Sequence, residues 1–138
     1  MKFKIILIVI FVSFIFSSCK KSAGQGGDSF IQGKVYAYYY NKTFTTKLDS
    51  AYAPNTDVYI IYGNDITFSD DQKTSYDGTY KFKYMRKGSY KIFVYSRDSA
   101  GTYNSTVNTS SPNIAILQNI TISKKKQTVD VPLITILK

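Results

Sequence analysis

The chain has 138 residues, a formal net charge of +9 and a single cysteine, so it has the length of one domain and cannot form an intrachain disulfide. It contains no histidine, and all nine of its acidic residues are aspartate. Because histidine is the usual general base near neutral pH and the commonest metal ligand, this composition excludes Ser-His-Asp, Cys-His and HExxH-type sites and leaves only Asp, Lys, Tyr and Ser chemistry.

The first nineteen residues have the three parts of a secretory signal. Two lysines precede an apolar run, and two serines come directly before Cys19. The apolar run is too short to span a bilayer as a mature helix. Its ending resembles the lipobox of bacterial lipoproteins, with Phe16 at the position where leucine is usual. The resemblance implies cleavage before Cys19 and lipidation of Cys19; the alternative is an ordinary secreted protein with a stray cysteine.

These features predict three parts of the chain. Residues 1–18 are the expected signal peptide, residues 19–29 the lipidated cysteine with a glycine-rich flexible tether, and residues 30–138 the folded domain. Lys20 follows the cysteine, whereas aspartate at this position is associated with retention in the inner membrane. The resemblance to known sorting signals therefore favours the outer membrane, on either its periplasmic or its surface face.

From residue 30 onward the sequence lacks helical periodicity and alternates as β-strands do. The first expected strand runs to residue 40 and is apolar or aromatic on both faces, and residues 41–53 are expected to form a loop or an irregular edge strand. Asp77-Gly78 predicts a hairpin turn, after which Tyr80, Phe82 and Tyr84 should face the core. Further strands are expected at residues 57–62, 72–75, 80–84 and 89–96.

The last forty residues contain two more expected strands, at residues 114–123 and 128–137, after a Ser/Thr/Asn-rich loop or weak edge strand. Three lysines at residues 124–126 separate them and predict a charged hairpin tip. Val131 and Leu133, with Val129, should face the core, and Pro132 indicates a sheet edge or a bulge because it has no N–H. About seven strands with regular turn signals favour an all-β, antiparallel β-sandwich.

Four short segments occur in a fixed order. They are Gly33-Lys34-Val35 and the stretches at residues 53–60, 74–82 and 85–92, the last two around Asp77-Gly78 and Gly88. In this order they resemble carboxypeptidase regulatory-like domains, which are related to transthyretin-like folds. The resemblance implies a seven-stranded, antiparallel, prealbumin-like β-sandwich with no catalytic residues of its own and no cofactor.

Two sets of surface residues are candidate binding sites. Tyr36, Tyr38 and Tyr40 could form an aromatic platform for a glycan or a peptide, although tyrosine is also favoured at half-buried sheet positions, and we favour that explanation. A second set could form one basic face of a hairpin that attracts acidic polymers, although solvated strand faces are commonly lysine-rich for solubility. This second set is Lys81, Lys83 and Lys91.

Short sequence motifs bear on metal binding and on glycosylation. Four aspartates lie between residues 65 and 77, but their spacing matches no EF-hand loop and the bidentate glutamate is missing, so we expect no metal. Ser50 and Ser99 each lie in an Asp-Ser-Ala sequence. This sequence resembles the short O-glycosylation motif of Bacteroidota-type bacteria, so both serines are candidate modification sites.

The sequence therefore predicts a non-enzymatic lipoprotein of the cell envelope that presents a β-sandwich as a structural or interaction module. Its expected partners are the membrane, through the lipid anchor, and other envelope proteins or glycans, with no nucleic acid. The alternative is a glycan- or peptide-binding accessory lipoprotein for a partner transporter. An enzyme would need two Asp, Lys or Tyr groups with perturbed pKa values in one pocket.

Overall fold

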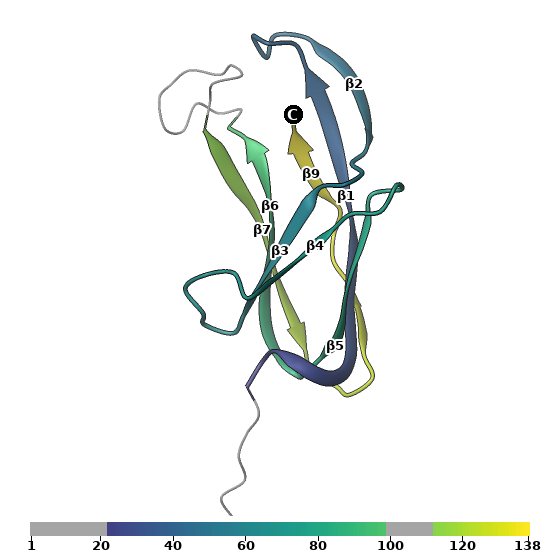
Figure 1. The fold of residues 1–138 in the computed structure, drawn as a ribbon, viewed down its shortest axis with the longest axis vertical. Coiled ribbons are helices and arrows are strands. Elements are labelled where there is room, and N and C mark those ends of the chain that lie inside the picture. The colour runs from purple at the N-terminus through teal and green to yellow at the C-terminus, as the bar shows by residue number, and fades with distance from the viewer. Residues whose placement is uncertain (1–21, 99–111) are drawn as a thin grey trace, which may run out of the picture.

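The computed structural model describes residues 22–98 and 112–138, which form two β-sheets packed face to face (Figure 1). The first sheet contains β1 (Gln25–Tyr40), β2 (Lys47–Tyr52), β5 (Thr79–Met85), β8 (Thr128–Asp130) and β9 (Ile134–Leu137). The second has the strand order β4 (Asp70–Lys73), β3 (Asp57–Tyr62), β6 (Gly88–Arg97) and β7 (Asn113–Ile122). Within the described ranges, no helix has the length and apolarity needed to cross a membrane.

The long strand β1 is the centre of the first sheet. Ile31 pairs with Phe82 of β5 on one side and with Val129 of β8 on the other, and Tyr36 is flanked in the same way by β2 and β9. The strands β8 and β9 run parallel to β1. The predicted all-β fold with two layers is thus confirmed, but the expectation of seven antiparallel strands is wrong, because the described residues form nine strands with two parallel pairings.

The core lies between the two sheets, where alternate residues of each strand point inward. Burial of a valine, isoleucine or methionine side chain stabilises the fold by roughly 1.5–3 kcal/mol relative to leaving it exposed. The largest apolar side chains with less than 2% of their surface exposed are Tyr90, Ile31, Ile60, Met85, Ile92, Ile122, Ile134, Ile136, Val35, Val58 and Val94. This set confirms the predicted inward faces of the strands at residues 57–62 and 89–96.

Two predicted hairpins instead connect one sheet to the other. At Asp77-Gly78 the chain does make a tight turn, in which the Gly78 N–H donates to the Ser75 carbonyl at 3.0 Å and Gly78 has a φ of 76°. However, β4 before the turn pairs with β3, and β5 after it pairs with β1. The three lysines at residues 124–126 likewise lead from β7 of the second sheet to β8 of the first. Turn residues indicate where the chain reverses. They do not indicate which strand the next segment pairs with, because that depends on which strand edge is free.

Two residues predicted to face the core are exposed. Tyr84 has a φ of 58° and is 63% exposed, because this left-handed residue breaks the alternation of β5 and turns Met85 inward. Leu133 is 52% exposed and lies in the break between β8 and β9, where Pro132 cannot donate a backbone hydrogen bond. Beyond this break the inward side chain is Ile134, which is fully buried.

The fold also begins earlier in the chain than expected. Strand β1 starts at Gln25, and residues 26–28 form a bulge opposite Met85. Just before it, the Gly24 N–H donates to the buried Tyr90 hydroxyl at 3.0 Å, and the Arg86 N–H donates to the Gly24 carbonyl at 2.8 Å. The part of the predicted tether from Gly24 onward is therefore fixed to the sandwich.

Candidate functional site

The three predicted tyrosines lie on one outer face of β1, and each is half-buried. Their rings already have partners. Tyr36 and Tyr38 meet edge to face at 5.5 Å between centroids, and the Lys47 ammonium lies 5.1 Å from the Tyr38 centroid. Tyr40 stacks on Phe44 at 5.4 Å. Much of the predicted platform is therefore used in packing within the sheet, as expected for aromatic side chains at neighbouring sheet positions.

A groove of about 560 Å³ lies beside two of these tyrosines. We call it the distal groove, because it lies near the end of the chain, where the Tyr40 N–H donates to the carbonyl of Lys138 at 2.9 Å. The outer face of β1 and β9 forms one side, and β6 and β7 form the other. Its lining residues are Tyr38, Tyr40, Phe44, Ser96, Arg97, Ile114, Ile116, Thr135 and Leu137.

The other predicted site residues are dispersed. Lys81 and Lys83 project from the outer face of β5 in the first sheet, whereas Lys91 lies on β6 in the second sheet, with its side chain opposite in direction to the buried Tyr90. The expected common basic face does not exist, because β5 and β6 do not pair. Ser50 is half-buried on the edge strand β2, opposite Tyr38, and its glycosylation stays a prediction. Cys19 and Ser99 lie outside the described residues.

The aspartates at residues 65–77 do not gather around a common point. The Asp70 carboxylate accepts a hydrogen bond from the Gln25 amide at 2.7 Å, and the Asp77 carboxylate accepts from Ser75, Thr79 and the Lys34 ammonium. These hydrogen bonds hold the pKa of Asp77 well below its usual range. Within residues 22–98 and 112–138, no three metal-ligating side chains are grouped closely enough to hold an ion.

The outer face of the second sheet carries a row of aromatic and apolar side chains that the sequence analysis missed. Tyr59 stacks on Phe93 at 5.0 Å, and Tyr95 meets both rings edge to face at 5.5 Å. Phe68, Tyr95 and Leu117 are 52%, 49% and 44% exposed. We call this set the aromatic row: Tyr59, Phe68, Phe93, Tyr95 and Leu117.

The aromatic row could have been recognised from the alternation in β6. Ile92 and Val94 are buried, so Phe93 and Tyr95 between and after them must point outward, where a solvated sheet face usually carries polar side chains. Burial, with the nearby Asp57 carboxylate as the next cause, raises the pKa of Tyr59 above its ordinary value. Its phenol is therefore neutral at physiological pH.

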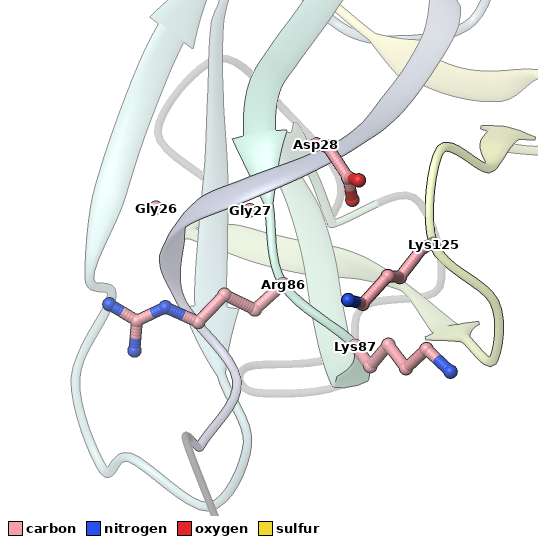
Figure 2. Close-up of a pocket in the computed structure, with 6 residues that line it drawn as sticks. All are labelled: Gly26, Gly27, Asp28, Arg86, Lys87 and Lys125. Carbon is pink, nitrogen blue, oxygen red and sulfur yellow. The ribbon is translucent and has the colours of Figure 1, made fainter.

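A second cavity, of about 510 Å³, lies at the opposite end of the sandwich from the distal groove. Three segments line it, namely the β1 bulge, the turn between β5 and β6, and the connection between β7 and β8. Figure 2 shows the Asp28 and Lys125 side chains pointing toward the space between them, while Arg86 and Lys87 extend in different directions. We call it the basic cleft, and its lining residues are Gly26, Gly27, Asp28, Arg86, Lys87 and Lys125.

Comparisons with known proteins assign no family. Neither a protein-family model nor a curated protein sequence matches the chain. A solved structure from Pseudomonas aeruginosa, provisionally described as a carbohydrate-binding protein, is similar at 14% identity and a TM-score of 0.47, over 84% of this chain and 92% of that chain. An (S)-allantoin synthase is similar at 12% identity and a TM-score of 0.43, over 80% of this chain and 42% of its own. The chain thus spans less than half of the synthase, and both similarities are too weak to support an argument.

Proposed function

We propose that this chain is a non-enzymatic lipoprotein of the cell envelope, anchored through Cys19, whose β-sandwich binds another envelope protein through the aromatic row. The lipobox-like ending of the first nineteen residues supports the anchor, and the four ordered segments support a carboxypeptidase regulatory-like, prealbumin-like domain. The observation that carries the binding function is the exposure of three large apolar side chains on one outer sheet face, those of Phe68, Tyr95 and Leu117.

The composition of the aromatic row fits a protein partner. Interface centres are enriched in tyrosine and phenylalanine, and in the aromatic row Tyr59 contacts the rings of Phe68, Phe93 and Tyr95. Charged side chains, such as Asp71 opposite Tyr59, lie at its margin, as in the polar rim of an interface. The rings also fix one another, so little side-chain entropy is lost when a partner covers them. An outer face that only had to be soluble would carry polar side chains at these positions.

Three tyrosines with buried or partly buried side chains are not candidate catalytic bases. Burial raises the pKa values of Tyr62, Tyr80 and Tyr90, so each phenol is neutral at physiological pH and supplies no phenolate to act as a base or a nucleophile. The catalytic use of tyrosine as a base requires the opposite shift. With no histidine and no glutamate in the sequence, the remaining charged proton-transfer groups are those of aspartate and lysine.

Photo-crosslinking in the native envelope tests the binding surface. A crosslinking amino acid at Tyr95 is expected to give a discrete adduct with another envelope protein, and the same substitution at Tyr76 is not. Tyr76 is the matched control, because it is an aromatic residue that is 94% exposed in a turn outside the aromatic row. Equal adducts from both positions, or none from either, would contradict the proposal.

Fatty-acid labelling tests the anchor. The Cys19→Ala variant is expected to lose all incorporation of a labelled fatty acid and the corresponding mass increase, because thioether lipidation requires the thiol. The Ser18→Ala variant is the control and should remain labelled, since alanine keeps a small residue before the cysteine. Persistence of the label in Cys19→Ala would show that the lipid is attached elsewhere or that the assignment is wrong.

A second candidate function is the capture of a glycan or a peptide for a partner transporter. The distal groove favours it, since it combines the rings of Tyr38 and Tyr40 with an aliphatic wall. The crosslinking experiment separates the two functions when Tyr40 is included as a third position. Adducts with glycan or peptide at Tyr40, together with none at Tyr95, would favour capture over binding of an envelope protein.

A further inference from the structure

The basic cleft lies at the end of the sandwich where the chain enters the fold. Figure 1 shows the start of β1, the turn between β5 and β6 and the connection between β7 and β8 at this end, with the C-terminus toward the other. The Arg86 guanidinium approaches the Ser22 carbonyl at 3.5 Å, and residues 23 and 24 pack on the same turn. The segment that enters the fold, residues 22–24, therefore lies directly beside the basic side chains of the cleft.

Positive charge is concentrated at this end. The two exposed loops carry five basic residues, and the only acidic side chain that lines the cleft is Asp28. In the described residues, the ion pairs are Lys34 with Asp77 and Lys73 with Asp57, so they neutralise none of these five. The five basic residues, which we call the basic end, are Arg86, Lys87, Lys124, Lys125 and Lys126.

The backbone that carries these cations is fixed by hydrogen bonds. The Gln127 side-chain carbonyl accepts from the backbone N–H groups of Ser123 and Lys124, both at 3.0 Å, and the Asp28 carboxylate accepts from the Lys126 N–H at 3.2 Å. On the other loop, the Tyr90 hydroxyl donates to the Arg86 carbonyl at 2.6 Å. The backbone of both loops is thus fixed, and the exposed lysine side chains extend from it.

One donor at the basic end lacks an acceptor. The Arg86 Nε is buried and makes no hydrogen bond within the described residues. Its guanidinium packs along Gly26, where an added Cβ would lie 3.1 Å from Nη2. A buried guanidinium N–H without an acceptor is costly. Because this Nε is covered, a phosphate cannot contact it directly, and Arg86 contributes to the basic end through its positive charge.

The position of the anchor decides which anion is within reach. Cys19 precedes Ser22 by three residues, a stretch that spans at most about 11 Å when fully extended. A lipid on Cys19 would therefore hold the basic end within roughly one or two Debye lengths of the headgroups at physiological ionic strength. Lys20 and Lys21 add two further charges to the connecting sequence.

We propose that the basic end is a membrane-docking surface, which binds the phosphates of anionic lipid headgroups and sets the sandwich upright on the bilayer that holds its anchor. This inference rests on the proposed lipid anchor. Juxtamembrane lysine and arginine residues attract anionic leaflets, with each charge strengthening association by roughly fivefold. Upright docking leaves the distal groove at the end of the domain that is farther from the membrane.

Lysine acylation of the full chain in vesicles tests the docking. In phosphatidylcholine vesicles containing about a third phosphatidylglycerol, the lysines at residues 87 and 124–126 should react roughly threefold or more slowly than in phosphatidylcholine alone. The distal Lys42 and Lys47 should react equally in both. High salt should remove the difference. Equal rates at the basic end in the two kinds of vesicle would overturn the proposal.

Further measurements distinguish membrane docking from the binding of soluble anions and from a missing lipid anchor. A Lys87→Gln, Lys124→Gln, Lys125→Gln variant should lose the protection of Lys126, whereas a Lys42→Gln, Lys47→Gln, Lys81→Gln variant with the same loss of charge should keep it. Inorganic phosphate added to neutral vesicles at matched ionic strength should not protect these lysines; equal protection would indicate a site for soluble anions and overturn membrane docking. Intact mass on the same samples reports the acyl chains, so failure of the anchor is recognised independently of failure of docking.

Discussion

The Gly27→Ala variant is expected to lose about 3 kcal/mol of unfolding free energy. Gly27 has no left-handed backbone conformation, so the cost does not come from φ. The cost is steric, because an added Cβ would collide with the Met85 carbonyl group and with the Cα of Arg86. Both neighbours belong to the backbone and cannot move away by changing a rotamer, so the bulge itself would have to lift from β5.

Thermal unfolding measures this effect, and the melting temperature should fall by roughly 10–20 °C in a domain of this size. Gly63→Ala is the matched control. Gly63 has a φ of 58°, but its added Cβ would meet only the Ala23 side chain at 3.9 Å. Its cost should be about 1–2 kcal/mol, from the left-handed conformation alone. Equal destabilisation by the two variants would contradict the close approach of the bulge to β5.

The second large effect is expected at Ile134 and tests the register of the last strand. Ile134 is fully buried beside Val35, so Ile134→Ala should cost about 3–4 kcal/mol through lost burial and the cavity left behind. Its neighbour Leu133 is 52% exposed, and Leu133→Ala should cost less than about 1 kcal/mol. Chemical denaturation of both variants gives the two free energies directly.

The test is which of the two variants loses more unfolding free energy. A continuous strand at residues 128–137 would place Leu133 inside and Ile134 outside, as the simple alternation of the sequence predicts. If the Leu133→Ala variant lost more unfolding free energy than the Ile134→Ala variant, the strand would have that continuous register and would not be broken at Pro132. Similar small losses at both positions would mean that this strand is not part of the core.

The sequence predicted the inward faces of the central strands of the second sheet, although not the aromatic character of their outer faces. In β3 and β6 the inward residues, such as Val58 and Ile92, follow from alternation alone. The predictions from alternation were wrong at Tyr84 and Leu133. A left-handed residue in one strand and a break in the other each shift the inward and outward positions by one residue. Pro132 did indicate an irregularity in the last strand, but not that the phase would shift there, and no residue type around Tyr84 indicates its left-handed conformation.

The candidate sites were harder to predict, because they depend on tertiary pairing. The basic cleft joins Asp28 to the backbone of Lys126, which is 98 residues away in the chain, and the crossing of β7 to β8 brings them together. The expected lysine face failed for the same reason, since it assumed that β5 and β6 pair. The tyrosines of β1 were correctly placed on one face, but the partners that occupy their rings come from Phe44 and the strand β2.

The central position of β1 has a mechanical consequence. A pulling force that enters the fold at Ser22 acts along β1, which is paired with β5 and β8 in its first half and with β2 and β9 in its second half. The inter-strand hydrogen bonds lie across this direction, so they are loaded together in shear rather than opened one after another. A domain tethered to a moving envelope through this strand would resist extraction far better than one tethered through an edge strand.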